Sequence, residues 1–189
     1  MSPLAGFPSS LKRFFGGERA ARRALIERVY EQIVAAARQP ALYADWAVPD
    51  TPLGRYEMVA LHMFLVLHRL RGGTGAAAAL AQDLTDGFFA DLDHSIRELG
   101  VGDLGVPKRM KKLARMFYGR AKAYGEAIEQ GSVEQLAEAL ARNIRPGEAE
   151  WPQASALARY VMAAHRRLAE QASVAITGGE VAFPAPAPA

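Results

Sequence analysis

The chain has 189 residues, of which 50% are hydrophobic and 23% charged, and its formal net charge at pH 7 is +3. Because it contains no cysteine, the sequence excludes disulfide scaffolds, zinc ribbons, iron–sulfur clusters and thiol catalysis. Four histidines leave little material for a metal site, and an aromatic content of only 8% favours helices over a β-sandwich.

The first 17 residues are basic and contain no apolar run of signal-peptide length. Within them lies a short basic-aromatic element that could contact an anionic membrane surface, formed by Lys12, Arg13, Phe14 and Phe15. A frayed terminus, or a helix folded back on the core, is the alternative that we favour for this segment. We therefore expect residues 1–17 to be flexible.

Apolar residues recur at helical spacing through most of the remaining chain. The expected helices cover about 18–38, 53–71, 75–99, 107–130, 132–145 and a stretch that begins at 152. The helix over 53–71 is apolar nearly all round, which is typical of the most buried helix of a domain. No apolar run reaches the roughly 20 residues that a transmembrane helix needs.

Local signals mark where two of these helices start. Thr51 precedes a proline and is an expected N-cap, and Ser132 with Gln135 three residues later forms a capping box. Together the patterns predict an all-α fold, a single compact domain of about six to seven helices over residues 18–173. The Ala/Pro-rich residues 174–189 are expected to be a disordered tail.

Charge is distributed unevenly between two neighbouring helices. Between Pro107 and Tyr124 stand seven basic residues and no acidic one, whereas the helix and loop before them carry six acids against one base. The two helices could neutralise each other, or the basic face could bind RNA phosphates, anionic lipid or an acidic protein surface. The candidate partner-binding residues are Lys108, Arg109, Lys111, Lys112, Arg115 and Arg120.

Motifs that carry catalytic chemistry are weak or missing. The glycines at 100, 102 and 105 match a dinucleotide-binding spacing, but they follow a helix rather than a strand, so a turn between helices is favoured. His62 lies in an apolar stretch, where a hydrogen-bonded core histidine is favoured over a ligand. The sequence therefore predicts no catalytic residue, metal or cofactor, and favours a binding protein over an enzyme.

Two long segments resemble the signatures of the ubiquinol–cytochrome c chaperone family. They are Trp46–Arg71 and Phe88–Lys112, the second continuing through Phe117–Arg120, with a weaker third element at Leu140–Ile144. The resemblance covers about residues 25–170. It implies an all-α, non-enzymatic assembly factor for the cytochrome bc1 complex that acts on newly made cytochrome b.

The resemblance also implies where the protein acts and with what. Mitochondrial members work with a small partner protein near the ribosomal exit tunnel, so the ribosome and a small accessory protein are further candidate partners besides cytochrome b. The chain looks like a bacterial member, expected in the cytoplasm and peripherally at the anionic inner membrane, without DNA as a partner.

Five residues could line a hydrophobic groove for a client helix: Met58, Met63, Met110, Met116 and Phe117. Ordinary core packing is the alternative, and it is favoured for the methionines. Two other functions remain open. One is a helical RNA- or ribosome-binding module that uses the basic helix 107–124, and the other is a helical enzyme with an unrecognised pocket.

Overall fold

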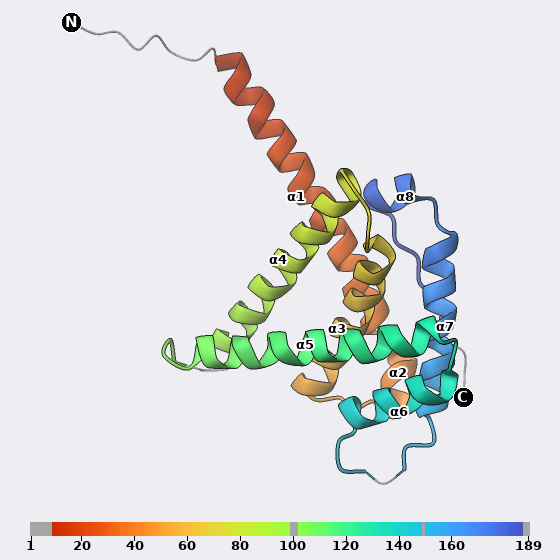
Figure 1. Ribbon diagram of the computed structural model, residues 1–189. Coiled ribbons are helices and arrows are strands. Elements are labelled where there is room, and N and C mark those ends of the chain that lie inside the picture. The colour runs from red at the N-terminus through yellow and green to blue at the C-terminus, as the bar shows by residue number, and fades with distance from the viewer. Residues whose placement is uncertain (1–8, 99–101, 149, 187–189) are drawn as a thin grey trace, which may run out of the picture.

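The computed structural model describes residues 9–98, 102–148 and 150–186, with the backbone only for residues 9–19. Within these ranges the chain forms eight helices and no strand, which confirms the all-α prediction (Figure 1). None of the described helices is long and apolar enough to span a membrane. The helices are α1 (Ser9–Ala37), α2 (Pro40–Ala44), α3 (Pro52–Leu70), α4 (Ala76–Glu98), α5 (Val106–Glu129), α6 (Val133–Ile144), α7 (Ala154–Glu170) and α8 (Ser173–Thr177).

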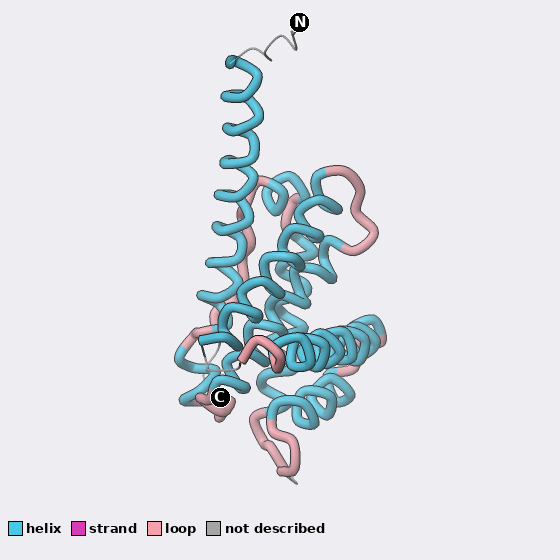
Figure 2. The backbone as a smooth tube through the Cα atoms, turned by 90° about the vertical axis from the view of Figure 1, so that its left-hand side faces the viewer, coloured by secondary structure: helices cyan, strands magenta, loops and turns pink. Residues whose placement is uncertain are grey.

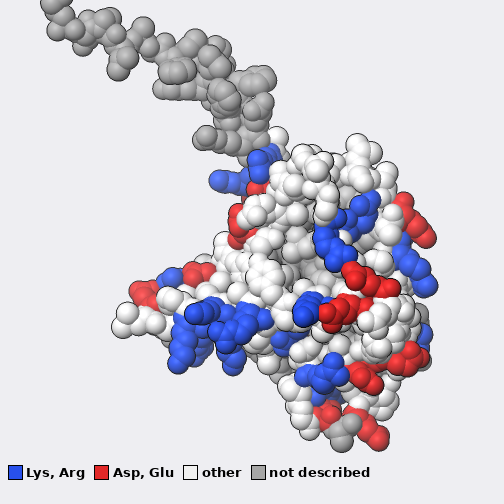
Figure 3. Space-filling view, in the orientation of Figure 1, with Lys and Arg blue, Asp and Glu red and all other residues white. Residues whose placement is uncertain are grey.

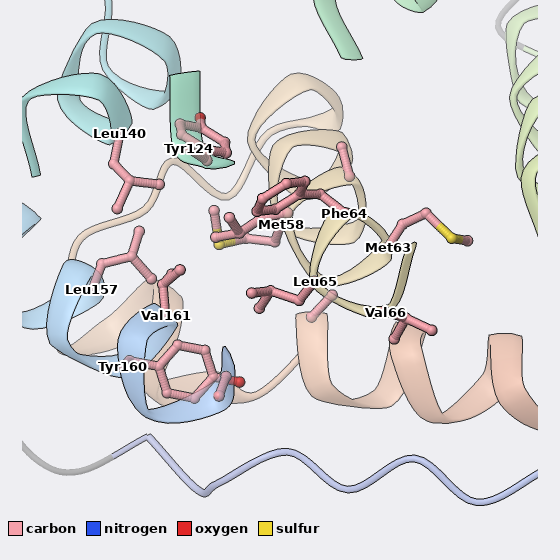
Figure 4. Close-up of a cluster of buried hydrophobic side chains, with 14 of the residues drawn as sticks. Met58, Met63, Phe64, Leu65, Val66, Tyr124, Leu140, Leu157, Tyr160 and Val161 are labelled. Atoms are coloured by element: carbon pink, nitrogen blue, oxygen red, sulfur yellow. The ribbon is translucent and has the colours of Figure 1, made fainter. Parts of the chain in front are cut away.

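Helix α3 lies at the centre of the fold, as its all-round apolar sequence predicts. It packs against α1, α4, α5, α6 and α7, and more than half of its residues are buried. Figure 4 shows side chains from four helices in one buried cluster, among them Phe64 and Leu65 of α3, Tyr124 of α5, Leu140 of α6 and Leu157 of α7. Burial of each such side chain stabilises the fold by about 1.5–3 kcal/mol.

The expected N-caps are present. The Thr51 hydroxyl oxygen accepts a hydrogen bond from the Gly54 amide at 3.1 Å, and the Ser132 hydroxyl oxygen accepts one from the Gln135 amide at 3.2 Å. Each bond satisfies one of the backbone N–H groups that a helix start leaves without a partner inside the helix. These starts fix the positions of α3 and α6 along the chain.

Helix α1 begins at Ser9 rather than at about residue 18, and it extends as a long single helix whose N-terminal half projects from the rest of the fold (Figure 2). The helices α4 and α5 diverge from the loop that joins them, so that α5 crosses the molecule below α1 and α4 (Figure 1). The N-terminal half of α5 therefore lies at a corner of the protein.

The C-terminal segment differs from the disordered tail that its composition predicts. Residues 173–177 form α8, and the segment from 179 to 183, here called the C-terminal strap, is held by two glutamine side chains. Gln32 of α1 donates a hydrogen bond to the Gly179 carbonyl at 2.8 Å and accepts one from the Val181 amide at 3.0 Å. Gln171 accepts one from the Ala182 amide at 3.2 Å. Because these three bonds satisfy buried backbone groups of the strap, it can pack on the helices without forming a helix itself.

Candidate functional site

Five basic side chains of α5 form an exposed row that we call the basic ridge: Lys108, Arg109, Lys111, Lys112 and Arg115. Figure 3 shows them gathered over the N-terminal half of α5. Among the described side chains none forms an ion pair with any of the five, whereas Lys122 further along the helix lies 3.9 Å from Glu126. The ridge therefore combines five positive charges on side chains that are all exposed to solvent.

Arg120, the sixth predicted member of the basic face, is not part of that surface. Its guanidinium turns inward and donates two hydrogen bonds of 2.6 Å to the two carboxylate oxygens of Glu57 on α3. The two side chains are only 12% and 2% exposed. A carboxylate buried on the central helix needs a cation, and Arg120 supplies it.

Burial governs the protonation of Glu57. Desolvation raises the pKa of Glu57 from its ordinary value to about 7, although the charge and hydrogen bonds of Arg120 oppose that increase. Arg120 therefore links α3 to α5 and cannot serve as a free cation for a partner.

The acidic residues of α4 do not neutralise the ridge. Asp83 pairs with Arg22 of α1, and Asp91 accepts a hydrogen bond from the Tyr30 hydroxyl at 2.8 Å. Asp93 and Asp103 both pair with Arg97. These acids thus hold α1 and the end of α4 in place. The sequence left open whether α4 and α5 neutralise each other, and the structure shows no ion pair between the acids of α4 and the basic ridge among the described side chains.

An aromatic cluster lies where α4 and α5 face each other. The rings of Phe88 and Phe117 are buried with a centroid distance of 5.3 Å, and Phe89 packs 6.0 Å from Phe117 and 6.2 Å from Tyr118. Tyr118 remains 57% exposed and Phe89 is partly exposed. We call Phe89 and Tyr118 the aromatic patch. The buried rings of Phe88 and Phe117 lie directly beneath it.

The expected client groove is largely part of the core. Met58 and Met63 are fully buried, and Phe117 is only 3% exposed, so these three side chains line no open groove. Met110 and Met116 are half-buried on α5. Helix α3 is enclosed by five other helices, and this explains why its methionines serve core packing, the alternative that the sequence favoured.

His62 is a hydrogen-bonded core residue, as predicted. It is fully buried, with Nδ1 2.8 Å from the Met58 carbonyl and Nε2 2.8 Å from the Tyr160 hydroxyl. The carbonyl can only accept, so Nδ1 carries the proton and Nε2 accepts from the tyrosine. Burial lowers the pKa of His62 to about 4, which keeps the ring neutral at pH 7.

The side chains of the predicted membrane element, Lys12, Arg13, Phe14 and Phe15, lie outside the described residues. In the part of the chain that the structure describes, no three His, Asp or Glu side chains are grouped so that they could hold a metal ion.

Comparisons with known proteins identify the family. Residues 44–183 match the model of the ubiquinol–cytochrome C chaperone family. The chain is also similar to the crystal structure of the Cbp3 homologue from Brucella abortus, with 53% identity and a TM-score of 0.85 over 92% of this chain and 96% of that one. A search of curated proteins gives no match. The chain therefore belongs to the ubiquinol–cytochrome c chaperone family.

Proposed function

We propose that this chaperone-family member assists assembly of the cytochrome bc1 complex by binding newly synthesised cytochrome b at the inner membrane. The observation that carries the proposal is the family match over residues 44–183, together with 53% identity to a Cbp3 homologue. Binding, rather than catalysis, is the activity proposed. The client is a membrane protein, so a chaperone for it must offer apolar surface to helices that have not yet packed.

The aromatic patch is the surface that we propose for this contact. Tyr118 is one of the few large hydrophobic side chains that the described part of the fold leaves exposed, and Phe89 lies beside it. Aromatic rings bury a large area at a small cost in side-chain entropy and therefore dominate many interfaces. Because Phe88 and Phe117 hold the patch from below, it can receive a client helix without rearrangement of the core.

Gene replacement tests this proposal. Deletion of the gene should abolish assembled bc1 complex and leave soluble c-type cytochromes in place. The wild-type gene should restore assembly, and Tyr118→Glu should not, because a carboxylate on the patch opposes burial against an apolar helix. Leu53→Glu is the matched control, since Leu53 is also exposed, at 49%, but lies at the start of α3.

The outcomes separate the parts of the proposal. Normal bc1 levels in the deletion strain would contradict the function itself. Full restoration by Tyr118→Glu would leave the function standing and remove the aromatic patch from it. If Leu53→Glu fails to restore bc1 assembly as completely as Tyr118→Glu does, an added carboxylate harms the protein at either position. The abundance of both variants is therefore measured in the same extracts.

A further inference from the structure

We infer that the basic ridge is a docking surface for a bilayer that contains anionic phospholipid, with Leu104 as the apolar residue that enters it. This inference rests on the proposed function for its setting at the membrane, and it names the surface and the lipid chemistry that would hold the protein there. The residues that carry the inference are the five cations of the ridge and Leu104.

The first argument is electrostatic. The ridge places Lys108, Lys111 and Lys112 within one helical turn, and the described side chains offer no acid to pair with them. Like charges at these spacings destabilise a helix. The helix dipole adds to the cost for Lys108 and Arg109, because they lie in the first turn of α5, where cations are unfavourable and no acidic residue is present. An anionic surface would reverse both effects.

The second argument is the residue that precedes the ridge. Leu104 is fully exposed, at 101%, in the turn directly before α5. An aliphatic side chain gains nothing from water, but it partitions favourably into the region just below lipid headgroups. Lysine and arginine stems beside it can lie along the membrane surface while their charges meet phosphates. Peripheral binding to an anionic bilayer combines buried apolar area with attraction between cations and lipid headgroups, and Leu104 and the ridge supply one of each.

The alternatives fit this surface less well. The cytoplasmic loops of membrane proteins are enriched in Lys and Arg, so the basic ridge would repel that side of a client such as cytochrome b. RNA would accept the cations, but it offers no apolar layer for Leu104. The aromatic patch is a separate set of residues.

Vesicle sedimentation with the full chain tests the inference. The wild-type protein should bind vesicles that contain 30% phosphatidylglycerol and should not bind pure phosphatidylcholine vesicles. Each ridge cation that a variant lacks should weaken binding to the anionic vesicles by roughly fivefold. The triple variant Lys108→Glu/Lys111→Glu/Lys112→Glu should lose at least about 100-fold in affinity. Leu104→Ser should weaken binding several-fold and leave its salt dependence unchanged.

The matched control carries the same change of charge on another face: Arg159→Glu/Arg166→Glu/Arg167→Glu on α7, where all three side chains are exposed. It should retain most of the lipid affinity. Equal losses in the two triple variants would overturn the inference, because net charge alone would then explain binding. The inference would also be overturned if the protein did not bind anionic vesicles, whether or not the ridge bound an RNA duplex in a salt-dependent way.

These results stand apart from the test of the proposed function. Vesicle binding requires no cytochrome b, so it is measured with the purified protein alone. If bc1 assembly is normal in the deletion strain while the ridge still binds lipid, the function fails and the docking surface stands. If bc1 assembly depends on the gene while the protein does not bind vesicles, the proposed function stands and the docking surface fails.

Discussion

Replacement of Arg120 by methionine should destabilise the protein in a pH-dependent way. In the folded state burial holds the pKa of Glu57 at about 7, above its ordinary value of 4.5. The carboxyl group therefore binds its proton more readily in the folded than in the unfolded chain. Its contribution to stability falls as pH rises between these two values, by about 3 kcal/mol in total.

Arg120→Met removes the cation that opposes this rise, so the pKa of Glu57 should increase further. At pH 8 the variant must then bury an unpaired carboxylate or keep it protonated, and we expect a loss of about 3–5 kcal/mol. At pH 5 Glu57 is protonated with or without Arg120. The loss should then be limited to the two hydrogen bonds, about 1–3 kcal/mol.

Urea unfolding at pH 5 and pH 8 measures both values. The control is the double variant Glu57→Met/Arg120→Met, which removes the charges together and should be close to wild-type stability at pH 8. Equal losses at the two pH values, or a double variant less stable than Arg120→Met alone, would refute the reasoning.

Three further variants test packing. Tyr160→Phe removes the partner of His62 Nε2 and should cost about 1–3 kcal/mol in urea unfolding; an unchanged midpoint would argue against that bond. Phe183→Ala should cost about 1–3 kcal/mol and speed hydrogen exchange in the C-terminal strap, because the ring packs 5.1 Å from His62; slow exchange would show that the glutamines hold the strap alone. Gly119→Ala should stabilise by about 0.5–1 kcal/mol, since nothing lies within 4 Å of the added carbon; destabilisation would place an unseen neighbour there.

Much of the fold follows from local rules. The starts of α3 and α6 depend on one side chain bonding a backbone amide three residues away, so Thr51 and Ser132 can be recognised in the sequence alone. The central place of α3 follows from its apolar circumference, and the burial of His62 from the same pattern.

The position of Arg120 could not be predicted from its own helix. A run of basic residues shows charge, but which member turns inward depends on Glu57, 63 positions earlier in the chain. One signal was present: Glu57 is an acid inside the most apolar helix, and such a carboxylate needs a cation from another element.

The C-terminal strap was also beyond local reasoning. The alternating Pro and Ala residues that follow it, 184–189, predict an extended chain end with no core of its own. What holds the strap in place comes from far away, since Gln32 lies 147 positions before Gly179. The groove prediction was wrong for Met58 and Met63 for a related reason, because enclosure of α3 depends on how the other helices assemble around it.

The most direct test of the proposed function is photo-crosslinking in growing cells from a probe placed at Tyr118. Our account predicts that the probe captures newly made cytochrome b, and that a probe at Leu53, on another exposed site, does not. Capture of cytochrome b from neither position, in cells where the protein supports bc1 assembly, would contradict a direct chaperone contact at the aromatic patch.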